Sequence, residues 1–510
     1  MHRLCRLRDQ LPLCHAQSAA VAAAVGPSIS FEVALPTDLP AALDGRLLLL
    51  ISKDPEPMSQ VGFMDSLQGC LMAGVDVDGL EPGHSARIDN GAVAFPLASL
   101  GEVPAGEYWV QAVLNVYETF HLSTGHTVKL PPGDQGDGQS WRQAPGNLFC
   151  TPQRLQLRAG APTFSLTLDN VMPPIPPPQD TQYIKHVTIK SERLSAFWGR
   201  DITLGAHVLL PEGFAEHPEA RYPLALFHGH FPADFSGFRP EPPEEDLEPD
   251  YAARFKLSGY NKITQEEHHA FYRRWTQEAG FPRFLCVEIA HPCPYYDDSY
   301  AVNSAAMGPW GDAIMYDLLP HIEATFRGIG AGWARFCYGG STGGWESLAA
   351  QLFYPEEFAG CFAACPDPVD FQAFTTMDIY ADSNAYYYDG AFKTDLQRPI
   401  NRDYTGNIKC TVRDANTYER VLGSLGRSCD QWDIWQAVFG PQDPETGYPQ
   451  PLYDKETGAI DRSVAEYWRE NYDLSHILRR DWEGGLREKV AGKLHIYCGT
   501  MVRDTRVVLP

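Results

Sequence analysis

The 510-residue sequence contains no continuous apolar run of about 18 residues, so it offers no candidate for a membrane-spanning helix. It is poor in positive charge, because 41 Lys and Arg stand against 65 Asp and Glu, which gives a formal net charge of -24. A nucleic acid or an anionic membrane surface needs a positive patch, and the charge therefore argues against both as partners. An apolar fraction of 44%, with 12% aromatic residues, indicates a globular chain long enough for two domains.

The twelve cysteines include no C-x-x-C pair and no His/Cys cluster at zinc spacing. His121 and His126 lie five residues apart in a predicted loop, and we interpret them as solvated histidines rather than as metal ligands. We therefore expect no metal and no organic cofactor. Scattered cysteines of this kind favour a reducing compartment, cytoplasmic or organellar, over secretion.

Residues 1–27 carry three arginines but no continuous apolar core, because Asp9, Pro12 and His15 interrupt it. We expect a disordered leader here, with a transit peptide as the alternative.

Residues 28–170 have the pattern of short strands separated by glycine- and proline-rich turns. Apolar residues alternate with polar ones over 31–35 and again over 108–117, and residues 47–51 form a continuous apolar run. This pattern predicts an N-terminal β-sandwich domain, which contains no recognisable catalytic cluster. Residues 171–180 are rich in proline, which favours an extended conformation, and we interpret them as a linker.

Residues 181–510 alternate short apolar strands with amphipathic helices, a rhythm that predicts a mostly parallel sheet with crossover helices. We expect strands over 222–227, 284–290 and 358–365, and helices over 265–279 and 311–326. Residues 371–490 interrupt the rhythm and are too long for a simple crossover, so we expect a lid-like insertion there. Its many aromatic residues are interpreted as packing the insertion rather than as stacking on a substrate.

A short apolar run, a glycine cluster and one serine stand at residues 334–346, before a predicted helix. Gly339 and Gly343 flank Ser341 in the pattern G-x-S-x-G, which is typical of a nucleophile elbow. In such a turn a strained backbone exposes the serine hydroxyl above the sheet. Ser341 is therefore the candidate nucleophile, and a structural turn is the alternative.

Acyl transfer by a serine also needs backbone N–H donors for the oxyanion. The residue after the nucleophile, Thr342, supplies one. The loop His228-Gly229-His230 follows a predicted apolar strand and supplies the second, through Gly229 or, as we expect, through His230.

With this strand and loop, the elbow and the loop at 291–304, residues 180–500 resemble the α/β-hydrolase superfamily. The similar branch comprises esterase D, feruloyl esterases and enterochelin-esterase-like proteins. The resemblance implies an α/β-hydrolase fold and hydrolysis of a carboxylic ester through an acyl-serine intermediate. It leaves open which ester, small-molecule or carbohydrate-linked, is the substrate.

The superfamily order is serine, then an acid after the seventh strand, then a histidine after the eighth. Residues 493–500 resemble strand seven, and residues 499–510 leave too little chain for a further strand and a histidine loop, so we interpret them as an alternative or misread end. The acid and the base therefore stay unassigned. Asp504, near the expected acid position, and His291, at the end of a predicted strand, are weak candidates.

Several further residues are predicted to lie on the same edge of the sheet and can line a pocket. They are His228, His291, Tyr295, Glu346 and Asp367. A loop-capping role for Asp367 and a role in satisfying buried polar groups for Glu346 are the plainer alternatives. Two functional hypotheses follow: a serine esterase, or a catalytically inactive binding protein that has lost its base.

Overall fold

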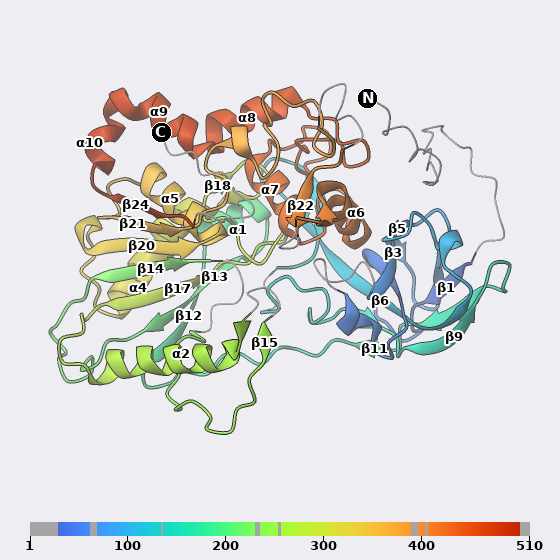
Figure 1. Cartoon of the computed structure of the whole chain (residues 1–510), viewed down its shortest axis with the longest axis horizontal. Helices are drawn as coiled ribbons and strands as arrows, with labels where there is room; N and C mark the ends of the chain where they lie inside the picture. Colours follow the sequence, from blue (N-terminus) through green and yellow to red (C-terminus); the bar gives the residue numbers. More distant parts are fainter. Residues whose placement is uncertain are drawn as a thin grey trace, which may run out of the picture.

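The structure is a computed structural model, and it describes residues 29–61, 69–133, 136–229, 235–252, 257–388, 396–402 and 406–499. Over these residues it shows an α/β fold with one mostly parallel seven-stranded sheet, together with N-terminal sheets that are largely antiparallel. In Figure 1 the N-terminal sheets lie on the right and the seven-stranded sheet on the left. No helix of the described residues is long and apolar enough to cross a membrane.

Two sheets form the N-terminal part, one with strand order β10-β1-β4 and one with order β11-β8-β6-β2-β3-β5, in which β6 also pairs with β7 and β9. The strands are β1 Phe31–Ala34, β2 Leu43–Ser52, β3 Cys70–Leu80, β4 Ser85–Ile88, β5 Val93–Phe95, β6 Gly106–His121, β7 Thr127–Leu130, β8 Leu148–Phe149, β9 Gln153–Leu157, β10 Phe164–Thr167 and β11 Asn170–Val171. Residues 173–180, which follow them, are exposed and have no regular secondary structure.

Both faces of the larger N-terminal sheet are covered. Val110, Ala112 and Leu114 of β6 point into the core between the two sheets. The opposite face packs on helix α6, Val412–Leu422, which belongs to a segment some 300 residues further along the chain. The larger N-terminal sheet and this distant helix therefore share one apolar cluster.

The seven-stranded sheet has the order β12-β13-β17-β14-β20-β21-β24. Its strands are β12 Ile184–Lys190, β13 Thr203–Leu209, β14 Leu224–His228, β17 Leu285–Ala290, β20 Arg335–Gly340, β21 Cys361–Ala364 and β24 Leu494–Tyr497. Neighbours from β17 to β24 pair in parallel, whereas β12 and β13 pair antiparallel. β24 forms one edge, and among the described residues no strand pairs with its outer side.

Helices cover both faces of this sheet. Successive side chains of a strand point to opposite faces, so apolar side chains of the strands meet helices on both sides. Trp275 of α2 packs with Ala225 and Cys286 on one face, and Trp345 of α5 packs on the other. The helices are α1 Glu192–Trp198, α2 Tyr260–Gln277, α3 Trp310–Ala313, α4 Leu319–Thr325, α5 Thr342–Phe353, α6, α7 Gln431–Phe439, α8 Arg462–Tyr472, α9 Leu474–Asp481 and α10 Arg487–Val490.

Shorter elements connect these helices and strands. In the described part of the chain, two of them are single turns of π-helix, η3 Ile314–Leu318 and η6 Trp482–Leu486. Four described elements are 3-10 turns: η1 Pro57–Gln60, η2 Leu100–Glu102, η4 Gly332–Ala334 and η5 Phe371–Ala373. The short two-stranded ribbons are formed by β15 Tyr251–Ala252 with β16 Leu257–Ser258, β18 Asn303–Ser304 with β19 Gly308–Pro309, and β22 Pro399–Arg402 with β23 Ile408–Thr411.

Between β21 and β24 the chain forms helices α6 to α10. In the view of Figure 1, α8, α9 and α10 lie above the sheet, and α6 lies to its right, next to the N-terminal sheets. An aromatic cluster holds this segment together, with Phe374 packed edge-on against Trp435 at 5.0 Å and against Trp468 at 5.4 Å. Aromatic contacts of this geometry stabilise a core beyond the area that they bury.

The predicted strands and helices of residues 181–365 are confirmed, with different ends. The helix expected over 265–279 begins earlier, at Tyr260, and the helix expected over 311–326 is divided by the π-turn η3. Sequence patterning did not predict that the polar face of β6 is also buried, because the helix that covers it lies in a distant segment.

Candidate active site

The carboxyl ends of three parallel strands bring the predicted site residues together. His228 ends β14 and pairs with Gly339 of β20, and Gly340 of β20 pairs with Ala364 of β21. Residues that directly follow these strands therefore meet at one edge of the sheet. Ser341 follows β20 there, and Asp367 lies three residues beyond β21.

Ser341 has the strained backbone that an elbow requires. Its φ of 55° and ψ of -121° lie in a region that residues with a side chain rarely adopt. Tight packing fixes this turn: a Cβ on Gly343 would lie 1.9 Å from the carbonyl oxygen of His228, and one on Gly339 would lie 2.4 Å from it. Only glycine allows β20, α5 and β14 to approach so closely.

The hydroxyl of Ser341 is exposed and donates a hydrogen bond to Oδ1 of Asp367 at 3.2 Å. The other oxygen of that carboxylate, Oδ2, accepts from Thr342 Oγ1 at 3.1 Å and from the Tyr300 hydroxyl at 3.0 Å. The backbone N–H of Asp367 donates to the carbonyl oxygen of Ser341 at 3.0 Å. Asp367 is thus both the hydrogen-bond acceptor of the Ser341 hydroxyl and, through its backbone N–H, a fixed part of the turn.

Thr342 is the first residue of α5, where a backbone N–H has no acceptor within the helix. The positive end of the helix dipole adds to its capacity to bind an anion. Gly229 directly follows β14 on the same edge, and its backbone nitrogen would lie 3.0 Å from a Cβ on Gly343. The predicted oxyanion donors Thr342 and Gly229 therefore flank the elbow, while His230 lies outside the described residues.

A buried group of ionisable side chains lies around α5. His228 Nδ1 is 3.4 Å from Oε2 of Glu346, and both side chains are 0% exposed. Burial lowers the pKa of His228 to about 3 and raises the pKa of Glu346 to about 8. At pH 7, which is below the pKa of Glu346 and above that of His228, both groups are mostly uncharged.

His291 is also buried, and its Nδ1 lies 2.8 Å from Ser299 Oγ. Burial, and next the neighbouring His228, lower its pKa to about 3. Among the described residues the hydrogen-bond acceptor of Ser341 is Asp367, not His291 or His228. This geometry gives no support to His291 as the base.

The remaining predicted residues lie elsewhere. The buried ring of Tyr295 packs 6.4 Å from that of Trp198, and Asp504 lies outside the described residues.

His126 Nε2 is 3.0 Å from the carbonyl oxygen of Pro444, which ties the N-terminal part to the segment before β24. Over the residues that the structure describes, no group of three His, Cys, Asp or Glu side chains could hold a metal ion.

The partnership of Asp367 with Ser341 and Tyr300 is what sequence reasoning missed. The sequence predicts Asp367 as a possible pocket residue but not as the hydrogen-bond acceptor of Ser341, and it gives no prediction for Tyr300. The sequence signal for Asp367 is its position just after β21, the strand that pairs with β20. No motif marks Tyr300, whose role depends on the fold.

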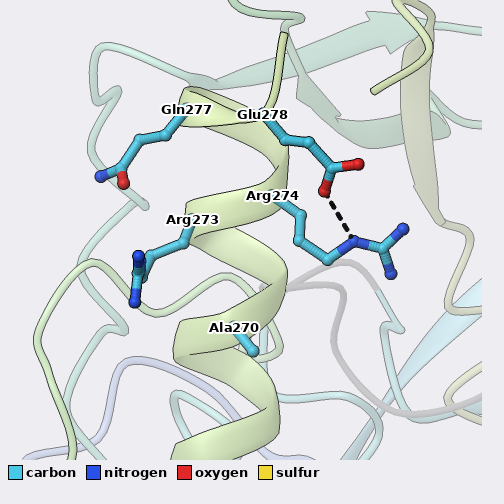
Figure 2. Close-up of a pocket in the computed structure, with 5 residues that line it drawn as sticks. All are labelled: Ala270, Arg273, Arg274, Gln277 and Glu278. Carbon is cyan, nitrogen blue, oxygen red and sulfur yellow. Dashed lines mark hydrogen bonds and ion pairs between the residues drawn. The ribbon is translucent and has the colours of Figure 1, made fainter. Parts of the chain in front are cut away.

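One surface hollow of the described residues lies away from this site. It has a volume of about 430 Å³ and is lined by five residues at the end of α2: Ala270, Arg273, Arg274, Gln277 and Glu278 (Figure 2). A hollow formed by one helix on its solvent side does not enclose a ligand. Another, of about 340 Å³, lies between the N-terminal part and the segment before α7, and it includes Tyr296 and Asp430.

No family model matches the sequence, and no curated protein matches it. Among solved structures, a ferulic acid esterase matches over 62% of this chain and 91% of its own, with 15% identity and a TM-score of 0.27. An S-formylglutathione hydrolase from Agrobacterium tumefaciens matches over 63% of this chain and 88% of its own, with 11% identity and a TM-score of 0.26. A siderophore hydrolase from Aspergillus nidulans matches over 64% and 91%, with 13% identity and a TM-score of 0.24. The structural neighbours of this chain are esterase-branch α/β-hydrolases of low identity.

Proposed function

We propose that this chain is a serine esterase of the α/β-hydrolase type, which hydrolyses carboxylic esters through an acyl-Ser341 intermediate. The observation that carries the proposal is the strained elbow, which holds the exposed Ser341 hydroxyl in a hydrogen bond to Asp367 at 3.2 Å. A backbone strained in this way is typical of functional sites. In this proposal residues 28–170 form a β-sandwich that supports the hydrolase domain, and residues 371–490 form its lid.

In the first half of the reaction Ser341 Oγ attacks the ester carbonyl carbon while its proton passes to Oδ1 of Asp367. The carbonyl oxygen becomes an oxyanion, which accepts hydrogen bonds from the backbone N–H of Thr342 and from the loop at Gly229. The bond to the alcohol then breaks, and the alcohol oxygen takes the proton from Asp367. In the second half a water molecule attacks the acyl-enzyme, and its proton passes to Asp367 and then to Ser341 Oγ. The products are the acid and free Ser341.

A carboxylate is a weaker base than an imidazole near pH 7, so this arrangement predicts slower turnover than a serine–histidine pair would give. The same observation supports a second candidate function. Among the described residues Asp367, rather than a histidine, accepts the hydrogen bond of the Ser341 hydroxyl, and a binding protein that keeps the pocket without catalysis would have the same arrangement. Turnover separates the two functions.

The proposed substrate is a small-molecule or carbohydrate-linked ester, and acyl transfer by serine requires no cofactor. The test is the hydrolysis of p-nitrophenyl acetate by the full chain and by Ser341→Ala. Ser463→Ala is the matched control, because Ser463 is exposed on α8 and bonds only locally, to Asp461. We expect turnover in wild type and in the control, and none above background in Ser341→Ala. Equal rates in wild type and Ser341→Ala would overturn the esterase assignment.

A further inference from the structure

Tyr300 lies on the loop after β17 and has no solvent-exposed surface. Its φ is 57° and that of the next residue, Ala301, is 51°, so two successive residues with side chains adopt the left-handed conformation. The backbone N–H of Tyr300 donates to Asp298 Oδ1 at 2.7 Å, which holds the turn. Strain of this kind persists only where the surrounding structure fixes it.

The hydroxyl of Tyr300 accepts two hydrogen bonds from α7. Trp435 Nε1 donates to it at 2.7 Å and Gln431 Nε2 donates at 2.6 Å. Gln431 and Trp435 are four residues apart, so both side chains lie on the same face of the helix. The Tyr296 hydroxyl donates to Oε1 of Gln431 at 3.1 Å, which orients the amide with its NH₂ group toward Tyr300.

A tyrosine hydroxyl has one proton and two lone pairs. An indole N–H can only donate, and the amide is oriented to donate, so both lone pairs of Tyr300 are occupied. Its proton is left to donate, and the acceptors within reach are Asp367 Oδ2 at 3.0 Å and Thr342 Oγ1 at 3.3 Å. The carboxylate is the stronger acceptor, because it is charged. Burial raises the pKa of Tyr300 well above 10, so that the proton is retained.

We propose that Trp435 and Gln431 of α7 are positioning residues of the active site, which direct the Tyr300 hydroxyl proton onto Oδ2 of Asp367. The inference rests on the proposed function for its catalytic meaning. With Oδ2 occupied by Tyr300 and Thr342, the carboxylate presents Oδ1 to Ser341. The segment between β21 and β24 therefore contributes directly to the alignment of the nucleophile.

The first test compares two substitutions on the same helix. Trp435→Phe keeps an aromatic ring and removes the N–H that bonds to Tyr300. Trp432→Phe is the matched control, because Trp432 is also buried and packs 5.1 Å from Trp435 in the same aromatic cluster. We expect ester turnover to fall about tenfold in Trp435→Phe and less than twofold in Trp432→Phe, with KM unchanged in both. Equal losses in both variants would mean that packing alone matters, and would overturn the proposal.

The second test needs no turnover. In protein labelled with ¹⁵N at tryptophan, the Trp435 indole resonance is assigned by its loss in Trp435→Phe and is then followed in Asp367→Asn. We expect this resonance to move, because the Tyr300 proton loses its charged acceptor, while the Trp432 resonance stays in place. An unmoved Trp435 resonance would overturn the proposal even in an active enzyme. A moved resonance in a chain without ester turnover would support the positioning and contradict only the proposed function.

Discussion

Ser341 and Asp367 are joined by two hydrogen bonds of opposite direction. The Ser341 hydroxyl donates to Asp367 Oδ1 at 3.2 Å, and the Asp367 backbone N–H donates to the Ser341 carbonyl oxygen at 3.0 Å. The hydrogen bond between the two backbones holds the loop at Asp367 against the turn at Ser341. The hydrogen bond between the two side chains therefore does not depend on their own conformations alone. Such preorganisation is what a nucleophile and its proton acceptor require.

Replacing Asp367 by asparagine tests the proton acceptor. Asparagine keeps the shape of the side chain and loses the basic oxygen, so we expect ester turnover to fall by about 10²-fold or more. Asp370→Asn is the matched control, because Asp370 is a buried carboxylate in the same loop that caps η5. Its turnover per folded molecule is expected to equal that of wild type. Undiminished turnover in Asp367→Asn would contradict the role of Asp367.

The close approach at the elbow makes a prediction about stability. A methyl group on Gly343 would meet the carbonyl oxygen of His228 at 1.9 Å, so Gly343→Ala must displace α5 or β14. We expect the free energy of unfolding to fall by about 2 to 4 kcal/mol, measured from urea denaturation. In Gly484→Ala a Cβ has no neighbour within 4 Å, and this control is expected to change stability by less than about 1 kcal/mol. Similar losses in both variants would contradict the packing argument.

The elbow was predictable because its signals are local. Gly339 and Gly343 stand two residues either side of Ser341, between an apolar run and an amphipathic helix, and each signal is readable within one short stretch. The alternation of strands and helices that indicates a parallel sheet is local in the same sense. These features therefore predicted the position of Ser341 at the end of a strand.

The partners of Ser341 were not predictable in the same way, because they depend on tertiary neighbours. Asp367 is 26 residues further along the chain, and Trp435 is 135 residues from Tyr300. Likewise Gln111, on the second face of β6, is polar in sequence and buried in the fold, where it donates to the carbonyl oxygen of Cys150 at 3.0 Å. The residue types gave no indication of these partners.

The junction between the N-terminal sheets and α6 makes a third prediction. Arg46 of β2 is buried and donates to the carbonyl oxygens of Val421 at 2.8 Å and Arg420 at 2.7 Å, at the C-terminal end of α6. Arg46→Met removes these donors and is expected to lower stability by about 3 kcal/mol.

The control for this change is Arg87→Met, because the Arg87 side chain is 52% exposed and pairs with Asp89 on the surface. Its effect is expected to stay below about 1 kcal/mol. Thermal unfolding of both variants provides the measurement, and an Arg46→Met protein as stable as Arg87→Met would show that the hydrogen bonds of Arg46 contribute nothing to stability.

The buried ionisable groups near the elbow predict how stability depends on pH. Glu346 has a pKa of about 8 in the folded chain, above its unfolded value of 4.5, so its contribution to stability is lost as the pH rises from 4.5 to about 8. His228 and His291 have a pKa of about 3, below their unfolded values, so their contributions are lost as the pH falls from about 6.5 toward 3. From these groups together we expect greatest stability near pH 6.5.

Glu346→Gln is expected to remove the loss of stability on the alkaline side of this optimum. Between pH 6.5 and 8 wild type is expected to lose about 2 kcal/mol through this group, and the variant is not. The exposed Glu356→Gln variant is the control and should follow wild type. Urea midpoints at the two pH values measure the difference. A Glu346→Gln protein that loses as much stability as wild type would contradict the assignment of a buried, protonated carboxyl.

The site at which a fluorophosphonate reacts with the chain tests whether Ser341 is the nucleophile, and mass spectrometry of the full chain and of its peptides locates that site. An activated serine reacts with such a probe in proportion to its nucleophilicity. We predict one adduct per chain, located on Ser341, slower to form in Asp367→Asn and absent in Ser341→Ala. A chain that forms no adduct, or that carries it on another residue, would contradict the claim that Ser341 is the nucleophile.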